Sequence, residues 1–183
     1  VTMASGHIDK IDPYTRNFSL YRVRAENSAS LSNNSISALY QDRDGLVWIG
    51  TTRGLTTYDP DTGRFTRLTS SDDLPEMKVM GVFQDSAGMI WISFHNEALV
   101  KFDKNAGQVV NRYPPQPPAD SFTKIVEDAN NPDILWLGTR LGGFARFDKK
   151  SGQFTYYPPN AREPEKGPVY DATYHEVVTD PDD

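Results

Sequence analysis

The sequence predicts an all-β protein, a β-propeller segment of four-stranded antiparallel blades with about three full blades and partial blades at both ends. Three observations support this fold class. A unit of roughly 44 residues repeats along the chain, each unit contains four short apolar runs, and no run has the 3.6-residue periodicity of a helix. Four strands in each unit of about 40–50 residues are typical of propeller blades, whereas a helix in each unit would indicate a solenoid.

The repeat is defined by its tryptophans and by the aspartates that precede them. Trp48, Trp91 and Trp136 lie in the matching frames GLVWIGT, GMIWISF and DILWLGT, at intervals of 43 and 45 residues. An apolar run that ends in Asp precedes each frame, and these aspartates, at positions 42, 85 and 128, are 43 residues apart. Marks that recur at one period indicate structural units that bury a core against their neighbours.

The four strands of the first complete unit follow one another closely. The run ISALYQD ends at Asp42, and the turn RDG separates it from the second run, VWIGT. The third run, LTTYD, ends at Asp59, and the turn PDTG leads to the fourth run, RFTRL. The runs are rich in β-branched and aromatic residues, which favour strands, and the Gly-bearing turns between them favour antiparallel hairpins.

The two ends of the chain extend the repeat. Residues 6–22 match the third and fourth strands of a unit, with Asp12 in the frame of Asp59, and residues 175–183 match a first strand, with Asp180 in the frame of Asp128. We therefore expect residues 1–183 to form one propeller segment, with blades near 6–35 (partial), 36–78, 79–121, 122–168 and 169–183 (partial). Open blade edges expose unpaired strands, so we also expect self-association through these edges or a dimeric parent protein.

Composition excludes several classes of function. The formal net charge of −6 argues against a nucleic-acid partner, which normally needs a basic face. No apolar run approaches the 20 residues of a membrane span, and the absence of cysteine excludes disulfides, thiol nucleophiles and cysteine-based zinc sites. The three histidines do not lie in a recognisable triad frame, so we expect no catalytic residues and no cofactor in this chain.

The segment LSNNSISALYQDRDGLVWIGTTRGLTTYDPDTGRFTRL, Leu31 to Leu68, resembles the two-component regulator propeller repeat. The family pattern is D-x-x-G-x-x-W-I-G-T followed by G-L-x-x-Y-D and a glycine turn. It is present here as Asp42, Gly45, Trp48, Gly50, Thr51, Gly54, Leu55, Tyr58, Asp59 and Gly63. The second unit departs from it, with Ser93 and Phe94 in place of Gly-Thr and Glu97 in place of the next glycine, and the third unit inserts two residues in DANNPDIL.

This resemblance implies a function as well as a fold. Such repeats form seven-bladed propellers in the extracytoplasmic sensor region of bacterial sensor histidine kinases and hybrid two-component systems. The resemblance therefore implies a ligand-sensing module of the bacterial periplasm or extracellular side. It would bind a carbohydrate or another small ligand, and it would signal to a histidine kinase that is not in this chain.

Strand order alone assigns the loops to two sides of each blade. Turns one and three are short and Gly-containing, while turn two and the links at 69–78, 114–121 and 158–168 are longer and irregular and share the opposite side. On this long-loop side we single out Arg53, His95, Asn96, Glu97 and Arg140 as candidate ligand-binding residues, with Arg53 and Arg140 at equivalent places in their units. Guanidinium, imidazole and carboxylate groups suit a sugar or a carboxylated ligand, although Arg–acid ion pairs or solvated loop residues would give the same pattern.

Other interpretations of the same residues predict different environments. The tryptophans could stack on sugars, but their place among aliphatic residues in mid-strand favours core packing, as it does for Tyr58, Phe102 and Phe147. The sequence DPDTG resembles the start of a calcium loop, but its counterparts DKNAG and DKKSG favour a plain turn and no metal. A propeller glycoside hydrolase and a protein-interaction propeller remain alternative functions, although Arg43 and Ser86 replace the Asp of a sialidase Asp-box.

Overall fold

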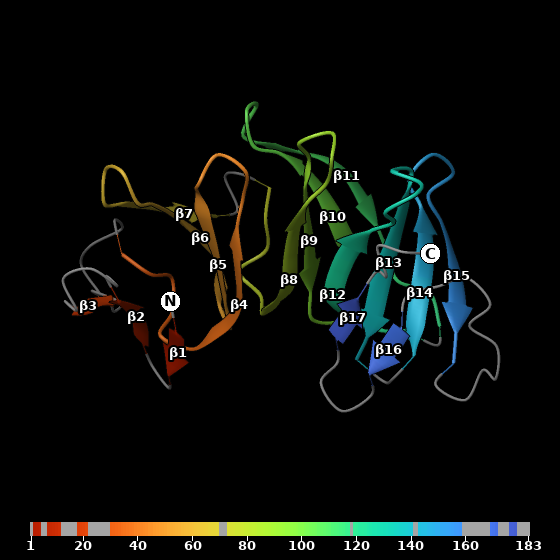
Figure 1. Cartoon of the computed structure of the whole chain (residues 1–183), viewed down its shortest axis with the longest axis horizontal. Helices are drawn as coiled ribbons and strands as arrows, with labels where there is room; N and C mark the ends of the chain where they lie inside the picture. Colours follow the sequence, from red (N-terminus) through yellow and green to blue (C-terminus); the bar gives the residue numbers. More distant parts are fainter. Residues whose placement is uncertain are drawn as a thin grey trace. The chain divides into compact units, whose positions relative to one another are not determined.

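The computed structural model describes the backbone of residues 2–4, 7–11, 18–21, 30–69, 73–117, 119–140, 143–158, 169–171 and 176–178, and the side chains of those from 30 to 158. All regular structure in these residues is β-strand (Figure 1). Within this described part of the chain, no helix is long and apolar enough to cross a membrane. The chain divides into two compact units, Val1–Val79 and Met80–Asp183, which are described separately below.

The first unit contains two antiparallel sheets. Strands β1 (Thr2–Ala4), β2 (His7–Ile11) and β3 (Phe18–Tyr21) form a three-stranded sheet in chain order. Strands β4 (Ile36–Gln41), β5 (Val47–Thr51), β6 (Gly54–Asp59) and β7 (Arg64–Leu68) form a four-stranded sheet, also in chain order. An up-and-down sheet of four strands is the architecture of a propeller blade.

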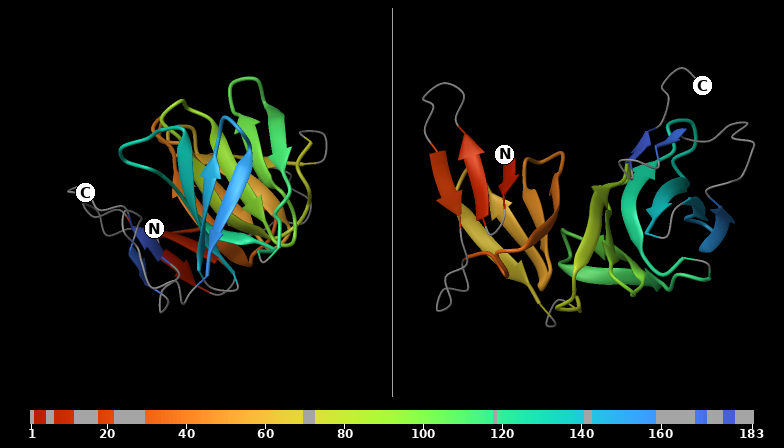
Figure 2. Two further views of the ribbon diagram at one scale, coloured as in Figure 1. Left: turned by 90° about the vertical axis from the view of Figure 1, so that its right-hand side faces the viewer. Right: turned by 90° about the horizontal axis from the view of Figure 1, so that it is seen from below.

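The second unit contains two further sheets of the same kind. Strands β8 (Val79–Gln84), β9 (Ile90–Phe94), β10 (Leu99–Asp103) and β11 (Gln108–Tyr113) form one, and the boundary between the units falls within β8. Strands β12 (Phe122–Glu127), β13 (Ile134–Thr139), β14 (Phe144–Asp148) and β15 (Gln153–Tyr157) form the other. The strands within each sheet are twisted relative to one another (Figure 2).

The chain ends in a two-stranded hairpin of β16 (Val169–Asp171) and β17 (Glu176–Val178). Strand β17 contacts β12 and β13, while β12 also contacts β9 of the preceding sheet. The run near the C-terminus that matches a first strand is therefore a strand, β17. Neither its partner β16 nor the strand β1 was expected from the sequence. The predicted frames of Asp12 and Asp180 lie outside the described residues, and the predicted blade limits stay a prediction.

Aromatic side chains from two sheets form the core of the second unit. Trp91 of β9 is fully buried against Phe147 of β14, with ring centroids 5.6 Å apart, and Phe122 of β12 belongs to the same cluster. The predicted burial of the aromatic residue before each third-strand aspartate is confirmed, since Tyr58, Phe102 and Phe147 are 8%, 2% and 0% exposed. Apolar burial of this kind is the main favourable contribution to the packing of blades.

The WIGT frame requires a small residue where the strand approaches its neighbours. A Cβ atom added to Gly50 would lie 2.7 Å from Val79 Cγ1 and 2.9 Å from Ala38 Cβ. The second repeat has Ser93 in place of this glycine. The buried hydroxyl of Ser93 donates to the Phe122 carbonyl at 2.7 Å. The departure from the repeat pattern at Ser93 therefore adds a hydrogen bond between two sheets.

We expect Gly50→Ala to lower the free energy of unfolding by about 1–3 kcal/mol, because the added methyl group overpacks a closed contact. The measurement is urea denaturation of the full chain. Thr66→Ala, at an exposed position of the same sheet, is the control and should change stability by less than about 0.5 kcal/mol. A Gly50 variant as stable as this control would show that the close approach is not rigid.

Candidate functional site

In each of the three complete repeats, the aspartate and the tryptophan that define the repeat are joined by a hydrogen bond. The indole Nε1 donates to the carboxylate at 3.0 Å for Trp48–Asp42, 2.8 Å for Trp91–Asp85 and 2.7 Å for Trp136–Asp128. The other carboxylate oxygen accepts amides of the turn, for example from Leu46 and Met89, both at 3.0 Å. The three indoles are 6% exposed or less, so the predicted core packing is confirmed and the motif is structural.

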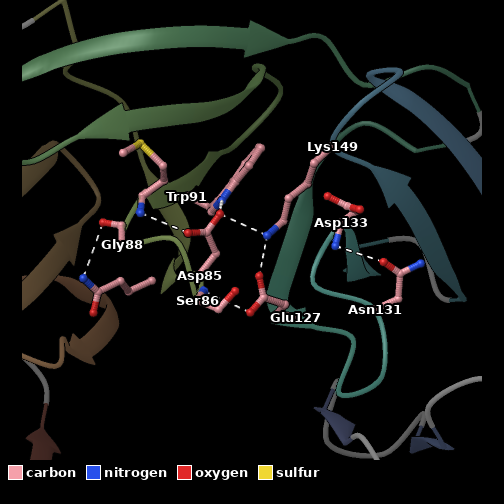
Figure 3. Close-up of polar contacts among 10 residues, drawn as sticks. Asp85, Ser86, Gly88, Trp91, Glu127, Asn131, Asp133 and Lys149 are labelled. Atoms are coloured by element: carbon pink, nitrogen blue, oxygen red, sulfur yellow. Dashed lines mark hydrogen bonds and ion pairs between the residues drawn. The ribbon is translucent and has the colours of Figure 1, made fainter.

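A buried ion-pair cluster connects the two four-stranded sheets of the second unit (Figure 3). Lys149, in the turn after β14, places Nζ 3.0 Å from Asp85 Oδ2 and also pairs with Glu127 Oε1. Glu127 Oε2 accepts the Ser86 amide at 2.9 Å. The Lys149, Asp85 and Glu127 side chains are 11%, 1% and 15% exposed, so the charges are largely removed from water.

The charge state of Asp85 follows from these contacts. Burial raises the pKa of Asp85, but hydrogen bonds from Trp91 and Lys149, the charge of Lys149 and the Met89 amide together lower it below its ordinary value. Asp85 is therefore an ionised, fully engaged carboxylate at neutral pH. A general acid or base needs a pKa near the working pH. The cluster is thus suited to holding the two sheets together.

The turn prediction for DPDTG is confirmed. Asp59 Oδ1 accepts the Asp61 amide at 2.9 Å, and Asp59 Oδ2 accepts the Thr62 hydroxyl at 2.7 Å. These bonds, that of Thr62 most of all, lower the pKa of Asp59. Asp103 and Asp148 accept amides of their own turns in the same way. Among the described residues, no group of three or more His, Asp or Glu side chains is arranged to hold a metal ion.

The long-loop side of the first unit contains a hollow of about 210 Å³. The hollow is lined by Ser32, Arg53, Arg67, Leu68, Thr69 and Glu76. These residues come from the segment before β4, the turn between β5 and β6, the end of β7 and the link that follows it. The hollow therefore lies on the side of the blade where the sequence predicts ligand binding, and it includes one predicted residue, Arg53.

One wall of the hollow is held in place by hydrogen bonds. Arg67 donates from Nε to the Ser30 carbonyl at 2.9 Å, and from Nη2 to the Leu31 carbonyl at 2.8 Å and the Ser30 hydroxyl at 2.9 Å. The Ser32 hydroxyl shares a 2.9 Å hydrogen bond with the hydroxyl of Thr51. The loop before β4 is thus fixed to the sheet, which makes this wall preorganised for binding.

Arg53 and Glu76 are the exposed charged groups of the hollow. The Arg53 amide donates to Thr51 Oγ1 at 3.0 Å, which fixes the backbone of the turn, and the neighbouring Gly54 amide donates to the Met77 carbonyl at 2.9 Å. Within the described part of the chain, neither charged side chain takes part in an ion pair. Both groups are available to a ligand, one as a donor and the other as an acceptor.

Three predicted site residues lie in the turn between β9 and β10 of the second unit. Asn96 has a positive φ of 56°, a conformation that Asn tolerates, and its backbone amide donates to the Ser121 hydroxyl at 3.0 Å. Glu97 accepts the amide of Ala98 at 3.2 Å, and His95 is half-buried. The turn is therefore ordered by local hydrogen bonds, with the side chain of Asn96 exposed.

Arg140 is held by an acid of its own unit. Its Nε donates to Asp120 Oδ1 at 3.2 Å, its Nη2 pairs with Asp120 Oδ2, and its amide donates to the Ser121 carbonyl at 3.1 Å. The hydrogen bond from Arg140 lowers the pKa of Asp120, and the same bond raises the pKa of Arg140. Arg140 and Asn96 thus meet at Ser121, whereas Arg53 belongs to the other compact unit.

The predicted equivalence of Arg53 and Arg140 is wrong by one residue. The Arg140 amide donates a hydrogen bond to the Ser121 carbonyl, and in the first repeat the Thr52 amide donates to the Ser35 carbonyl. Arg140 therefore corresponds to Thr52. The offset is present in the sequence, since Arg53 follows Trp48 by five residues and Arg140 follows Trp136 by four. The two turns also close differently, because the Thr139 amide donates to the Gly143 carbonyl, whereas Thr51 pairs with Gly54. The two arginines therefore lie in different settings, one lining a hollow and the other in an ion pair.

Sequence reasoning missed Glu76, Arg67 and Ser32 as parts of one site. Glu76 lies in the link at 69–78, which the strand order places on the long-loop side, and this position is the one signal for it in the sequence. Arg67 ends the fourth run and Ser32 precedes the first, and only the folded sheet brings them together. Lys149 was noted only as an argument against a metal, because its partners are 22 and 64 residues away.

Comparison with known proteins supports the repeat and the fold. Residues 30–53 match the profile of the family described as two component regulator propeller, which confirms the resemblance over that segment. No curated protein matches the chain at a significant level.

Solved structures from B. thetaiotaomicron are similar to this chain in fold. The extracellular domain of BT3049, described as a hybrid two component system, has a TM-score of 0.71 and 24% identity over 84% of this chain and 21% of its own. The extracellular domain of BT4673, described likewise, has a TM-score of 0.70 and 20% identity over 88% and 21%. A second BT4673 structure, described as a one component system, has a TM-score of 0.71 and 21% identity over 91% and 24%.

These likenesses confirm the predicted fold class, an all-β propeller segment of four-stranded antiparallel blades. The chain spans between one fifth and one quarter of the length of each of these structures.

Proposed function

We propose that this chain is part of an extracytoplasmic ligand-sensing propeller of a bacterial two-component system, and that it binds a carbohydrate or another small polar ligand. The matched repeat at residues 30–53 supports the family, and the fold similarity to extracellular domains of such systems supports the location. The signal would pass to a histidine kinase outside this chain.

The observation that carries the proposal is the hollow on the long-loop side of the first unit. Arg53 and Glu76 line it, and neither pairs with another charge among the described residues. Its volume of about 210 Å³ is below the range of about 300–1,000 Å³ typical of drug-sized ligands, which favours a small ligand such as one sugar ring. Loops on a rigid sheet scaffold are where such sites usually lie.

We propose a secondary role for the candidate residues of the second unit. His95, Asn96 and Glu97 present polar groups in one turn, and Arg140 lies beside them at Ser121. Arg140 would have to leave Asp120 before it could bind a ligand. Arg53 is therefore the stronger candidate.

Signalling requires that the ligand binds two states of the sensor with different affinities. We propose that ligand binding changes either the arrangement of blades or a contact between two copies of the parent protein. Exposed blade edges would supply such a contact, because their unpaired strands can bond to another chain.

We expect Arg53→Ala to raise the dissociation constant for the bound saccharide about 10- to 100-fold, since it removes hydrogen bonds from a charged donor. The measurement is titration calorimetry of the full chain with the best binder from an array of neutral and acidic mono- and oligosaccharides. Arg64→Ala, an exposed arginine at the other end of the same sheet, is the matched control and should leave affinity unchanged.

Two outcomes would contradict this proposal. The first is an Arg53 variant that folds normally and binds as tightly as the Arg64 variant. The second is hydrolysis of the bound saccharides in turnover assays, which would favour a propeller glycoside hydrolase over a sensor.

A further inference from the structure

We infer that the hollow of the first unit selects a sugar acid, a saccharide ring that carries a carboxylate, over a neutral sugar. This inference rests on the proposed function, because it names the ligand class of the same site. It follows from the charges, the donors and acceptors, and the size of the hollow.

The charged residues that line the hollow are Arg53, Arg67 and Glu76, in a chain whose formal net charge is −6. Arg67 directs Nε and Nη2 at Ser30 and Leu31, so its guanidinium group is used in holding the wall. The cation that remains for an anionic group of a ligand is therefore Arg53.

Arg53 is the group that would bind the anion directly. Its side chain is exposed and has no ion-pair partner among the described residues, while its backbone is fixed by the Thr51 hydroxyl. A guanidinium group pairs with a carboxylate through two parallel hydrogen bonds, which are stronger than bonds to a neutral hydroxyl. A carboxylate on the ligand thus gains more from Arg53 than a sugar hydroxyl does.

Glu76 restricts the rest of the ligand. As a carboxylate it accepts hydrogen bonds and donates none, so it requires donors and repels a second anionic group. Sugar hydroxyls supply such donors, and the polar residues Ser32 and Thr69 also line the hollow. A ligand that is anionic all round, such as inorganic phosphate, would gain at Arg53 but be repelled at Glu76.

The remaining features of the hollow fit a single ring. Leu68 provides an apolar side chain in the lining, which suits the C–H face of a pyranose. A volume of about 210 Å³ is below the range typical of drug-sized ligands, which favours a small one. One carboxylate, several hydroxyls and one ring together define a uronic acid or a similar sugar acid.

The test is titration of the full chain with D-glucuronate and D-glucose at matched pH and salt, followed by the same titrations with variants. We expect glucuronate to bind at least 10-fold more tightly than glucose. Arg53→Gln should reduce this preference to less than about 2-fold, and Glu76→Gln should weaken both sugars while the preference for glucuronate persists. Arg64→Gln is the matched control and should retain the full preference. Circular dichroism and thermal melting confirm that each variant is folded.

The outcomes separate this inference from the proposed function. If glucose binds as tightly as glucuronate and both depend on Arg53, the sensor proposal stands and the sugar-acid inference is wrong. The inference is also wrong if a folded Arg53→Gln variant keeps the preference for glucuronate. If every saccharide on the array fails to bind the wild-type chain, the proposed carbohydrate site and this inference fall together.

Discussion

Replacing Trp91 with alanine should lower the free energy of unfolding by about 3–5 kcal/mol, the range found when large aromatic residues are removed from cores. Trp91 is completely buried and packs on Tyr113 and Phe147, with ring centroids 5.8 and 5.6 Å away. The change also removes the 2.8 Å hydrogen bond from the indole to Asp85, which leaves a buried carboxylate with one donor fewer. Equilibrium urea denaturation followed by near-UV circular dichroism measures the effect.

The control for this variant is Val110→Ala. Val110 is 52% exposed on β11 of the same sheet as Trp91, so its truncation should cost less than about 0.5 kcal/mol. A Trp91 variant that loses less than about 1 kcal/mol would contradict the central place of this residue in the core of the second unit.

The second large effect is expected at Lys149. We expect Lys149→Met to lower the free energy of unfolding by about 3 kcal/mol, because it leaves Asp85 and Glu127 as neighbouring buried charges without their cation. Methionine preserves the length and apolar contacts of the lysine stem, so the loss reports mainly on charge. Lys150→Met is the matched control: Lys150 pairs with Asp133 at the surface, with 77% of its side chain exposed, and its loss should cost less than about 1 kcal/mol.

The Lys149 effect should depend on pH in a defined direction. The folded-state pKa of Asp85 is below its ordinary value, so Asp85 contributes stability above the unfolded-state pKa of about 3.9 and loses it as the pH falls further. Without Lys149, burial of Asp85 is less well compensated and its pKa rises. The stability difference between wild type and variant should therefore be largest near pH 7 and shrink below about pH 4. A difference that is constant from pH 7 to pH 3 would show that Lys149 acts only through packing.

Much of the fold could be predicted because the repeat is local in sequence. The Asp and Trp of each first hairpin lie six or eight residues apart, and their hydrogen bond fixes both at the same place in each blade. The strands on either side of this turn have β-branched and aromatic residues, and a glycine with positive φ, such as Gly45 in the first repeat, closes the turn. These features depend on neighbouring residues, which a sequence displays directly.

The features that escaped prediction depend on distant residues. Lys149 meets Asp85 across 64 residues, and the repeat shows only that a lysine follows an aspartate there. The one-residue offset between Arg53 and Arg140 is different, because it can be counted in the sequence: Arg53 follows Trp48 by five residues and Arg140 follows Trp136 by four. The strands β1 and β16 are three residues each and carry too few residues for a periodic pattern.

Only part of the candidate site could be predicted from the sequence, because its residues come from segments far apart in the chain. Strand order was enough to place Arg53 on the long-loop side, where the hollow lies. Glu76 lies 23 residues further along, in a link that the strand order places on the same side, but no repeat pattern distinguishes it from its neighbours in that link. The structure adds the hollow they share and the hydrogen bonds that hold its wall.

A crystal structure of the full chain soaked with D-glucuronate is the most direct test of the ligand-sensing account. We expect a single ring in the hollow of the first unit, with its carboxylate on the Arg53 guanidinium and its hydroxyls near Glu76. Electron density for the sugar at the short-turn side of the blades, with the Arg53 hollow empty at saturating concentration, would contradict it.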